Sequence, residues 1–180
     1  MLFRSKEINY EIAQAKNGKP ALIYLKLNSL SDELLIYKLI EAAKAGVNIK
    51  LIIRGICCLP TQSKQFKNNI QAISIVDEYL EHARVIIFHH GGKDKTYISS
   101  ADWMVRNLDH RIEAACPIFA ESIKTELKDL MLIQLTDNVK ARKLDNELTN
   151  HYVQALGKTR IRSQLATYTY LKRKAITKGQ

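Results

Sequence analysis

A histidine and an arginine stand two residues apart at the entrance to an apolar segment. His82 and Arg84 lie just before Val85-Ile86-Ile87-Phe88, and in an extended chain two such side chains point to the same face. An imidazole can transfer a proton near neutral pH, and a guanidinium can neutralise the charge of an oxyanion. The pair therefore indicates chemistry on a phosphoryl group, while a histidine considered by itself is more often structural or simply exposed.

Charged and polar side chains also end two apolar segments. Lys26 and Asn28-Ser29 end the segment 21–27, and Arg54 directly follows the segment 47–53. In open α/β sheets the ends of parallel strands face the ligand crevice. We expect these side chains to converge there as an anion pocket; the alternative is that both strand ends are polar only because they are exposed.

A third polar stretch, Ser99-Ser100-Ala101-Asp102-Trp103, follows a predicted strand and precedes Met104-Val105-Arg106-Asn107. Hydroxyl and amide groups at a strand end can bind phosphate oxygens, although an ordinary turn with a helix cap is the simpler interpretation. Neither G-x-x-x-x-G-K nor G-x-G-x-x-G occurs in the sequence, so no glycine-rich phosphate loop is expected. The tandem His89-His90 has Asp94 as its only close carboxylate and predicts an exposed turn, not a metal site.

The spacing of apolar residues predicts alternating strands and helices. A strand at 21–27, a helix capped by Ser31-Asp32-Glu33 and a strand at 47–53 form a β-α-β unit, which must be parallel and right-handed. The other predicted strands are 73–76, 85–88, 96–100 and 111–115, with 96–100 pairing back on 85–88. The other predicted helices are 3–17, 120–135 and 162–175, with a short helix or turn at 77–82 and a helix near 144–155 as an option.

These elements predict an α/β fold in which one domain, residues 1–180, has a mixed sheet flanked by helices. We divide it into an N-terminal helix (1–19), an α/β core (20–136) and a helical tail (137–180). The first residues have no signal-peptide pattern and resemble a helix entered midway, which predicts a domain cut from a longer chain. No apolar stretch approaches the roughly 20 residues that span a bilayer.

Composition narrows the class of partner and the compartment. The formal charge is +10, from 28 Lys and Arg against 18 Asp and Glu. This favours anionic partners such as nucleic acid, a membrane surface, nucleotides or polyphosphate, and a basic solvated surface without a partner is the alternative. Cys57, Cys58 and Cys116 form neither C-x-x-C nor an even framework, so we expect reduced thiols in a cytoplasmic protein. Cys116, in the apolar run 114–119, is predicted to be a small core residue.

Five segments together resemble the last domain of the long bacterial polyphosphate kinases. They are Tyr24-Leu25-Lys26-Leu27-Asn28-Ser29-Leu30, Leu51-Ile52-Ile53-Arg54-Gly55-Ile56-Cys57, Tyr79-Leu80-Glu81-His82-Ala83-Arg84, Tyr97-Ile98-Ser99-Ser100-Ala101-Asp102-Trp103-Met104 and Arg106-Asn107-Leu108-Asp109-His110-Arg111-Ile112-Glu113. The resemblance extends over residues 3 to 172. Its motifs are specific in combination, above all R-G-I-C and L-E-H-x-R followed by S-S-A-D-W-M.

The resemblance implies a phospholipase D-like α/β fold, because the last two domains of that family each resemble a phospholipase D half, with an active site between them. The phospholipase D signature is H-x-K-x₄-D followed by G-S-x-N. Here Arg84 stands in place of the Lys, His89 in place of the Asp, and Ser99-Ser100-Ala101-Asp102 in place of G-S-x-N. The first and third departures look typical of the kinases and favour a kinase over a phosphodiesterase. Val105 replaces a proline expected in D-W-M-P-R-N-L, a minor change in a loop.

The same resemblance implies a reversible transfer of the terminal phosphate of ATP to polyphosphate, through a phosphohistidine in the preceding domain. Arg54 would contact the nucleotide phosphates. His82 would be the second essential histidine, acting as acid or base or stabilising the transferred group. The further candidates for nucleotide or phosphate binding are Lys26, Asn28, Arg84, Ser100, Asp102, Arg106 and Arg111. Mg²⁺ should accompany the nucleotide, although no carboxylate cluster that would hold it is evident.

The implied partners are ATP or ADP, polyphosphate and the preceding domains, with homo-oligomerisation of the full-length chain and no specific nucleic acid. This domain alone is expected to be inactive. The implied location is the cytoplasm, with membrane association as an option. Two alternatives stay open. One is a phospholipase D-like phosphodiesterase half that dimerises to complete its site, motivated by His82. The other is a basic nucleic-acid-binding module, motivated by the net charge and by Lys172-Arg173-Lys174.

Overall fold

The computed structural model describes residues 2–66, 69–157 and 159–178. Within these residues one sheet has seven strands in the order β6-β5-β4-β1-β2-β3-β7. The strands are β1 (Leu22–Leu27), β2 (Asn48–Ile53), β3 (Ile70–Ile75), β4 (Val85–Phe88), β5 (Lys95–Ser99), β6 (Ala115–Ile118) and β7 (Ala141–Lys143). The helices are α1 (Leu2–Lys16), α2 (Glu33–Lys44), α3 (Val105–Asp109), α4 (Glu121–Leu135) and α5 (Ser163–Lys178), with a 3₁₀ turn η1 (His90–Gly92). Strands β1, β2 and β3 are parallel and the other four pair antiparallel, which confirms the predicted mixed sheet.

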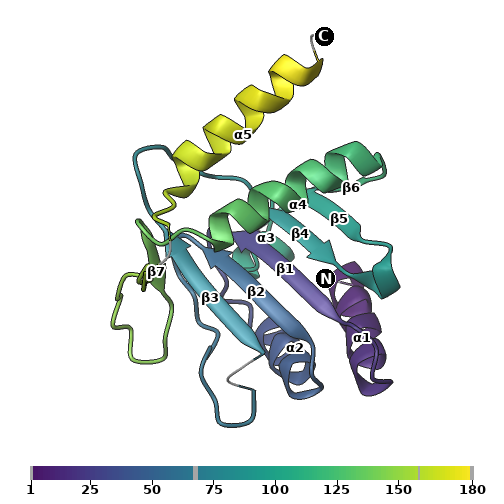
Figure 1. Ribbon diagram of the computed structural model, residues 1–180. Helices are drawn as coiled ribbons and strands as arrows, with labels where there is room; N and C mark the ends of the chain where they lie inside the picture. The colour runs from purple at the N-terminus through teal and green to yellow at the C-terminus, as the bar shows by residue number, and fades with distance from the viewer. Residues whose placement is uncertain (1, 67–68, 158, 179–180) are drawn as a thin grey trace.

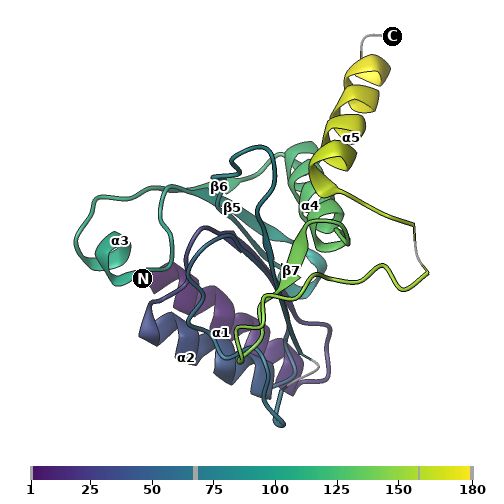
Figure 2. The ribbon, with the colours of Figure 1, turned by 90° about the vertical axis from the view of Figure 1, so that its left-hand side faces the viewer.

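Helices cover both faces of this sheet. Helices α1 and α2 lie against one face and α4 lies across the other, while α5 projects away beyond α4 (Figures 1 and 2). Alternate residues of β1 serve the two layers. Ile23 and Leu25 join the larger apolar core under α1 and α2, and Tyr24 joins a smaller core with Met131 of α4. The period of two along the strand therefore builds a three-layer domain.

The β1-α2-β2 unit forms as predicted. The Asp32 carboxylate caps α2 by accepting a hydrogen bond from the Leu35 N–H at 2.9 Å. Gly46 takes a positive φ of 99° just after the helix, a conformation that glycine adopts without strain. Strands β1 and β2 then run parallel with Leu27 opposite Ile53. This register brings the residues that follow the two strands, Asn28 and Arg54, side by side.

The strand predicted at 111–115 lies instead at 115–118, where β6 pairs antiparallel with β5 at the edge of the sheet. Pro117 is compatible with this place, because proline within sheets is confined to edge strands and bulges. The preceding residues form the unpredicted helix α3 and a loop. Strand β3 begins at Ile70, three residues before the predicted start at 73.

The helix considered near 144–155 does not form. Residues 141–143 are strand β7, which pairs antiparallel with β3. Leu148 and Asn150 then have positive φ angles of 53° and 56°, which a right-handed helix excludes. The Arg142 guanidinium lies 3.9 Å from the centre of the Tyr152 ring, and holds the returning chain against β7. The tail predicted as helical therefore begins with a strand, and only α5 fulfils that part of the prediction.

Two predictions about burial were wrong. Cys116 is exposed, because β6 is an edge strand whose residues are only partly covered. The His89-His90 turn is half-buried. The His90 ring stacks on Tyr10 of α1 with ring centroids 3.9 Å apart, and the His90 N–H donates to the buried carboxylate of Glu11 at 2.6 Å. These contacts attach α1 to the turn between β4 and β5.

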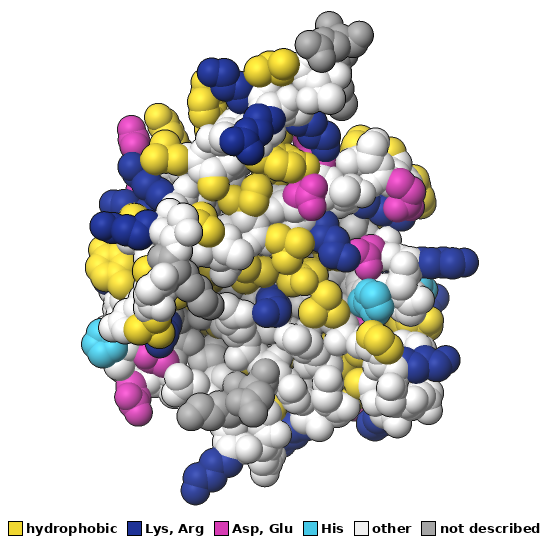
Figure 3. Space-filling view, in the orientation of Figure 1, with side chains coloured by type: hydrophobic (Ala, Val, Ile, Leu, Met, Phe, Trp, Pro, Cys, Tyr) yellow, Lys and Arg dark blue, Asp and Glu magenta, His cyan; other side chains and the backbone are white. Residues whose placement is uncertain are grey.

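Figure 3 shows the distribution of charged side chains over one face of the molecule. On the face shown in Figure 3, Lys and Arg side chains alternate with apolar, acidic and neutral ones and do not merge into one continuous basic patch. Among the described residues, no helix combines the length and apolar character needed to cross a membrane.

Candidate functional site

The ends of β1 and β2 carry the first pair of site residues. Asn28 and Arg54 follow the paired residues Leu27 and Ile53, and the Arg54 Nε donates to the Asn28 Oδ1 at 3.1 Å. Gly55 lets the two chains approach this closely, since a Cβ at that position would come within 3.0 Å of the Asn28 carbonyl oxygen. The R-G step thus has a local physical reason.

Asp102 joins this strand end to the His82 segment. Its Oδ1 accepts hydrogen bonds from the backbone N–H groups of Asn28 at 2.8 Å and Ser29 at 3.2 Å. Its Oδ2 accepts from the Arg84 Nη2 at 2.9 Å, and that same nitrogen lies 3.1 Å from the His82 Nε2. The contacts therefore run from β1 to the imidazole without a gap.

The loop that carries Asp102 is fixed by its own backbone. The Trp103 side chain is fully buried. The Trp103 backbone N–H donates to the Ser29 carbonyl at 3.2 Å. The Trp103 backbone carbonyl accepts from the backbone N–H groups of Ser31 and Asp32 at 2.8 Å each. Trp103 therefore packs against the start of α2 and fixes the turn that carries the Asp102 carboxylate.

Hydrogen bonding keeps the Asp102 carboxylate charged. Burial raises its pKa, but the hydrogen bonds from Arg84 and from the Asn28 and Ser29 N–H groups outweigh burial and hold the pKa below its ordinary value. An anionic Asp102 then acts as counter-ion to Arg84 and orients its guanidinium. The ion pair is well covered, with 13% of the Arg84 side chain and 7% of the Asp102 side chain exposed.

Lys26 lies one pleat behind Asn28, on the α4 face of the sheet. Its Nζ donates to the Glu81 Oε2 at 2.5 Å and to the Gln134 Oε1 at 2.7 Å. Burial lowers the pKa of the Lys26 ammonium, and the charge of Glu81 partly offsets this effect. The amine is therefore engaged beneath the His82 segment, where Lys26, His82 and Gln134 line a cavity of about 290 Å³.

Ser100 and Arg111 belong to a neighbouring cluster around Glu113. The Ser100 hydroxyl and the Asn107 side-chain amide both donate to the Glu113 carboxylate. These two bonds, aided by the positive charges of Arg111 and Arg84, hold the pKa of Glu113 below its ordinary value. Arg111 also lines a hollow of about 360 Å³ with Asn107 and Glu113.

Arg106 stands apart from the other candidates. It is exposed on α3, and no hydrogen bond or ion pair joins it to another residue of the described chain. Its predicted role in phosphate binding therefore depends on a partner outside this set of contacts.

Three residues of the site were not singled out from the sequence. Glu81 could have been, since it directly precedes His82. Glu113 fell inside a predicted strand, which hid its position in a loop. Gln134 gave no signal, because it lies 108 residues from Lys26 in the chain and meets it only through the packing of α4.

No resident metal centre emerges from these side chains. In the described part of the chain no three His, Cys, Asp or Glu residues group closely enough to hold a metal ion. The carboxylates of the site, on Asp102, Glu113 and Glu81, are each engaged by two or more donors.

The family model that matches residues 3–164 is described as polyphosphate kinase C-terminal domain 2. The chain is 49% identical to the polyphosphate kinase of Vibrio cholerae serotype O1 and 47% identical to that of Escherichia coli K12, in each case over 92% of this chain and 24% of the relative. The chain thus spans about a quarter of the length of these curated relatives.

Solved structures agree. A polyphosphate kinase crystal structure from Porphyromonas gingivalis matches with a TM-score of 0.94 and 45% identity, over 97% of this chain and 27% of that chain. The phospholipase D family member Nuc from Salmonella typhimurium matches with a TM-score of 0.52 and 13% identity, over 75% of this chain and 89% of that one. That second likeness shows the fold alone and confirms the predicted phospholipase D-like fold. The family match and the 45–49% identities together show that this chain belongs to the polyphosphate kinase family, as its C-terminal domain 2.

Proposed function

We propose that this domain binds the phosphates of ATP or ADP and of polyphosphate, and serves the reversible transfer of a phosphoryl group between them. The phosphohistidine of that reaction belongs to a region of the longer enzyme outside this domain. The observation that carries the proposal is the line of contacts from Arg54 through Asn28, Asp102 and Arg84 to His82. It places two guanidinium groups and an imidazole at one edge of the sheet.

The proposed phosphoryl transfer requires cationic groups in this domain more than it requires a nucleophile. Phosphoryl transfer depends mainly on positioning and on neutralising charge on the phosphoryl oxygens. We assign the nucleotide phosphates to Arg54 and the transferred group to Arg84, whose direction Asp102 fixes. The His82 side chain is exposed and can meet that group, either to exchange a proton or to donate a hydrogen bond.

Two donors in the cluster support an anionic ligand. Asn28 Nδ2 and Arg84 Nε are buried and have no hydrogen-bond partner among the described residues. Buried polar groups without a partner are uncommon, and phosphate oxygens are strong acceptors for such donors. A small movement of either side chain on ligand binding would pair them.

We infer secondary roles for the remaining candidates. Ser100, Arg106 and Arg111 are proposed to contact the polyphosphate or nucleotide at the rim of the site, where all three are exposed. Lys26 is proposed to contribute indirectly, by holding Glu81 beside His82, because its amine already donates to Glu81 and Gln134.

Mg²⁺ is proposed to arrive with the nucleotide. The engaged carboxylates described above do not fit a resident Mg²⁺ site, which would need free oxygen ligands. We therefore propose that phosphate oxygens of the nucleotide are the main ligands of the Mg²⁺ ion.

Calorimetric titration of Mg-ATP and of tripolyphosphate into the chain tests the proposal. Removing a charge-assisted hydrogen bond costs about 1.5–3 kcal/mol, so Arg54→Ala and His82→Ala should each weaken binding by about tenfold or more. Arg160→Ala is the matched control, because Arg160 is exposed and makes no hydrogen bond or ion pair within the described chain.

The possible outcomes separate the hypotheses. Equal binding by the wild type and Arg54→Ala, or no binding by a folded wild type, would contradict a phosphate site in this domain. Tight binding of duplex DNA that ATP does not displace would favour the basic nucleic-acid module instead.

The cellular setting stays a prediction. Cys57, Cys58 and Cys116 are free thiols, which supports a cytoplasmic location. Association with a membrane and homo-oligomerisation of the longer chain also stay predictions.

A further inference from the structure

The segment that carries His82 has no regular structure of its own. Residues 76–84 connect β3 to β4 without a helix or strand, and the side chains of Val76 and Leu80 are 66% and 71% exposed. The one backbone–backbone hydrogen bond that the described chain gives this segment is at its last residue, where the Arg84 carbonyl accepts from the Ser99 N–H at 3.1 Å. The position of the imidazole must therefore come from side-chain contacts made by the segment.

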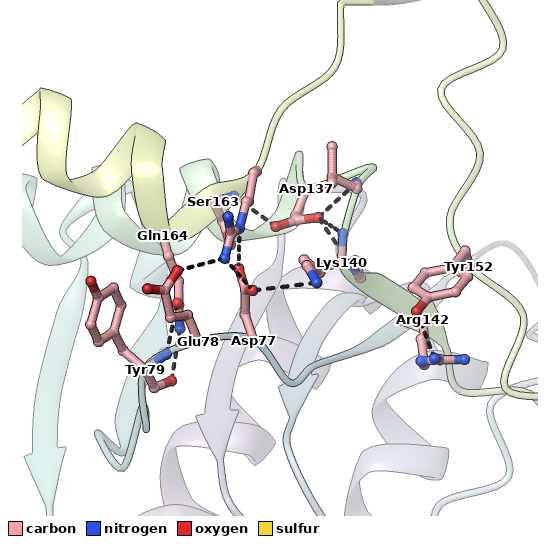
Figure 4. Close-up of polar contacts among 12 residues, drawn as sticks. Asp77, Glu78, Tyr79, Asp137, Lys140, Arg142, Tyr152, Ser163 and Gln164 are labelled. Carbon is pink, nitrogen blue, oxygen red and sulfur yellow. Dashed lines mark hydrogen bonds and ion pairs between the residues drawn. The ribbon is translucent and has the colours of Figure 1, made fainter.

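Arg162, just before α5, forms ion pairs with the first acidic residues of the segment. Its Nε and Nη2 donate to the two oxygens of Asp77 at 2.8 and 2.7 Å, and Nη2 also donates to Glu78 at 3.0 Å. This two-pronged pairing fixes orientation as well as distance. The Asp77 side chain is only 1% exposed, and the Arg162 guanidinium holds the pKa of Asp77 below its ordinary value. Figure 4 shows the acidic pair reaching up to the start of α5.

The start of α5 is itself fixed to the sheet. Asp137 accepts a hydrogen bond from the Ser163 N–H at 2.7 Å through one oxygen. Its other oxygen accepts from the N–H groups of residues 139, 140 and 141, where β7 begins. Figure 4 shows Asp137 between Ser163 and the start of β7. Because Arg162 directly precedes Ser163, it is anchored to the sheet through Asp137 and can transmit that rigidity to the His82 segment.

A second set of hydrogen bonds holds the other end of the segment. Glu81, the neighbour of His82, accepts from the Gln134 Nε2 at 2.6 Å and the Lys26 Nζ at 2.5 Å. The Gln164 side chain pairs with both backbone polar groups of Tyr79. The segment is thus tied to β1, α4 and α5 on both sides of the exposed Leu80.

We propose that Arg162 is a positioning residue for His82: its grip on Asp77 and Glu78 sets the segment that presents the imidazole next to Arg84. This inference deepens the proposed function and rests on it for its meaning in phosphoryl transfer. The Arg162 guanidinium is engaged by Asp77 and Glu78. It acts through Asp77, and a shift of about 1 Å at a reacting group is enough to cost on the order of 100-fold in rate.

The test follows the His82 ring in the 180-residue chain by ¹H–¹³C NMR. The ring resonance is assigned by its loss in His82→Asn. Arg162→Lys keeps the charge but loses the paired geometry, and Asp77→Asn removes the ion pair from the other side. We expect both to move the His82 ring resonance in the same direction and to weaken tripolyphosphate binding about fivefold or more. The thermal midpoint of each variant shows that it is folded.

Arg160→Lys is the matched control and should leave both measurements unchanged. An unmoved His82 resonance in folded Arg162→Lys and Asp77→Asn would overturn the inference, whatever happens to binding. Failure of the proposed function looks different: the ring resonance would move, yet the wild type and His82→Asn would bind tripolyphosphate equally. The two ideas can therefore fail separately.

Discussion

At the scale of single residues, Asp102 joins three partners in the candidate site. It accepts from two backbone N–H groups and from a guanidinium at the same time, and it is 5% exposed. A phospholipase D signature has an asparagine-containing motif at this place, and a neutral amide there could not balance Arg84. The Asp102 carboxylate balances and orients the Arg84 guanidinium that stands in place of the signature lysine.

Asp102→Asn should destabilise the folded chain by about 3 kcal/mol at pH 7, because it leaves the covered Arg84 charge without its partner. The folded-state pKa of Asp102 is depressed. Its contribution is therefore complete above the unfolded pKa of about 3.9 and is lost as the pH falls through the lower folded pKa. Urea unfolding of both proteins should show a stability gap at pH 7 that closes below about pH 4. A gap independent of pH would contradict this account.

Lys26 illustrates a residue whose type was informative and whose partner was not. A lysine at a strand end predicts an anion contact, and the structure gives it the carboxylate of Glu81. The same amine meets Gln134, which no local pattern could connect to it. The sequence therefore indicated that the Lys26 amine would meet an anion, but the position of the amine depended on the packing of α4.

At the scale of elements, the short strand β4 supports the site from below. It pairs with β1 on one side and with β5 on the other, so it aligns the segment entering at Arg84 with the end of β1. All four of its residues are buried. Strands β1 and β5 are far apart in the sequence, and β4 lies between them in the sheet.

Ile86→Ala tests the role of β4. Ile86 is fully buried in the core between the sheet and α1–α2, so truncation should cost about 2–5 kcal/mol in the free energy of unfolding. Ile112→Ala is the control, because the Ile112 side chain is completely exposed and its loss should be nearly neutral. Chemical denaturation measures both, and a small effect for Ile86→Ala would discredit the strand assignment.

At the scale of the whole molecule, the chain covers 24% of the length of its curated relatives. Within that length it has a sheet covered on both faces and two apolar cores of its own. The candidate site lies at one edge of the sheet, with His82 exposed. Such an open site suits a pocket that another region completes.

The chain by itself should therefore bind phosphates without making polyphosphate from Mg-ATP. The physical reason is that phosphoryl transfer in the proposed mechanism needs a nucleophilic histidine that this domain does not supply. The assay follows polyphosphate formation with the isolated chain, beside a longer kinase as positive control. Sustained synthesis by the isolated chain would refute the proposed division of labour.

The sequence by itself determined the elements with strong local patterns and the family to which the chain belongs. Periodic apolar residues predicted β1, α2, β2, β4, α4 and α5, because each pattern is complete within one element. The polar residues at strand ends followed from that assignment, since parallel strands must end at the same edge. Asn28 and Arg54 could thus be placed near one another before any coordinates, whereas the grouping of His82 and Arg84 with them rested on the family resemblance.

Only the tertiary structure decided how these parts meet. The shift of β6 to 115–118 depended on its pairing with β5, and β7 became a strand because β3 offered it a free edge. The contact of Asp102 with Asn28 spans 74 residues, and that of Arg162 with Asp77 spans 85. Local propensity carries no information about such distant partners, because their free energy is gained only when the whole sheet has formed.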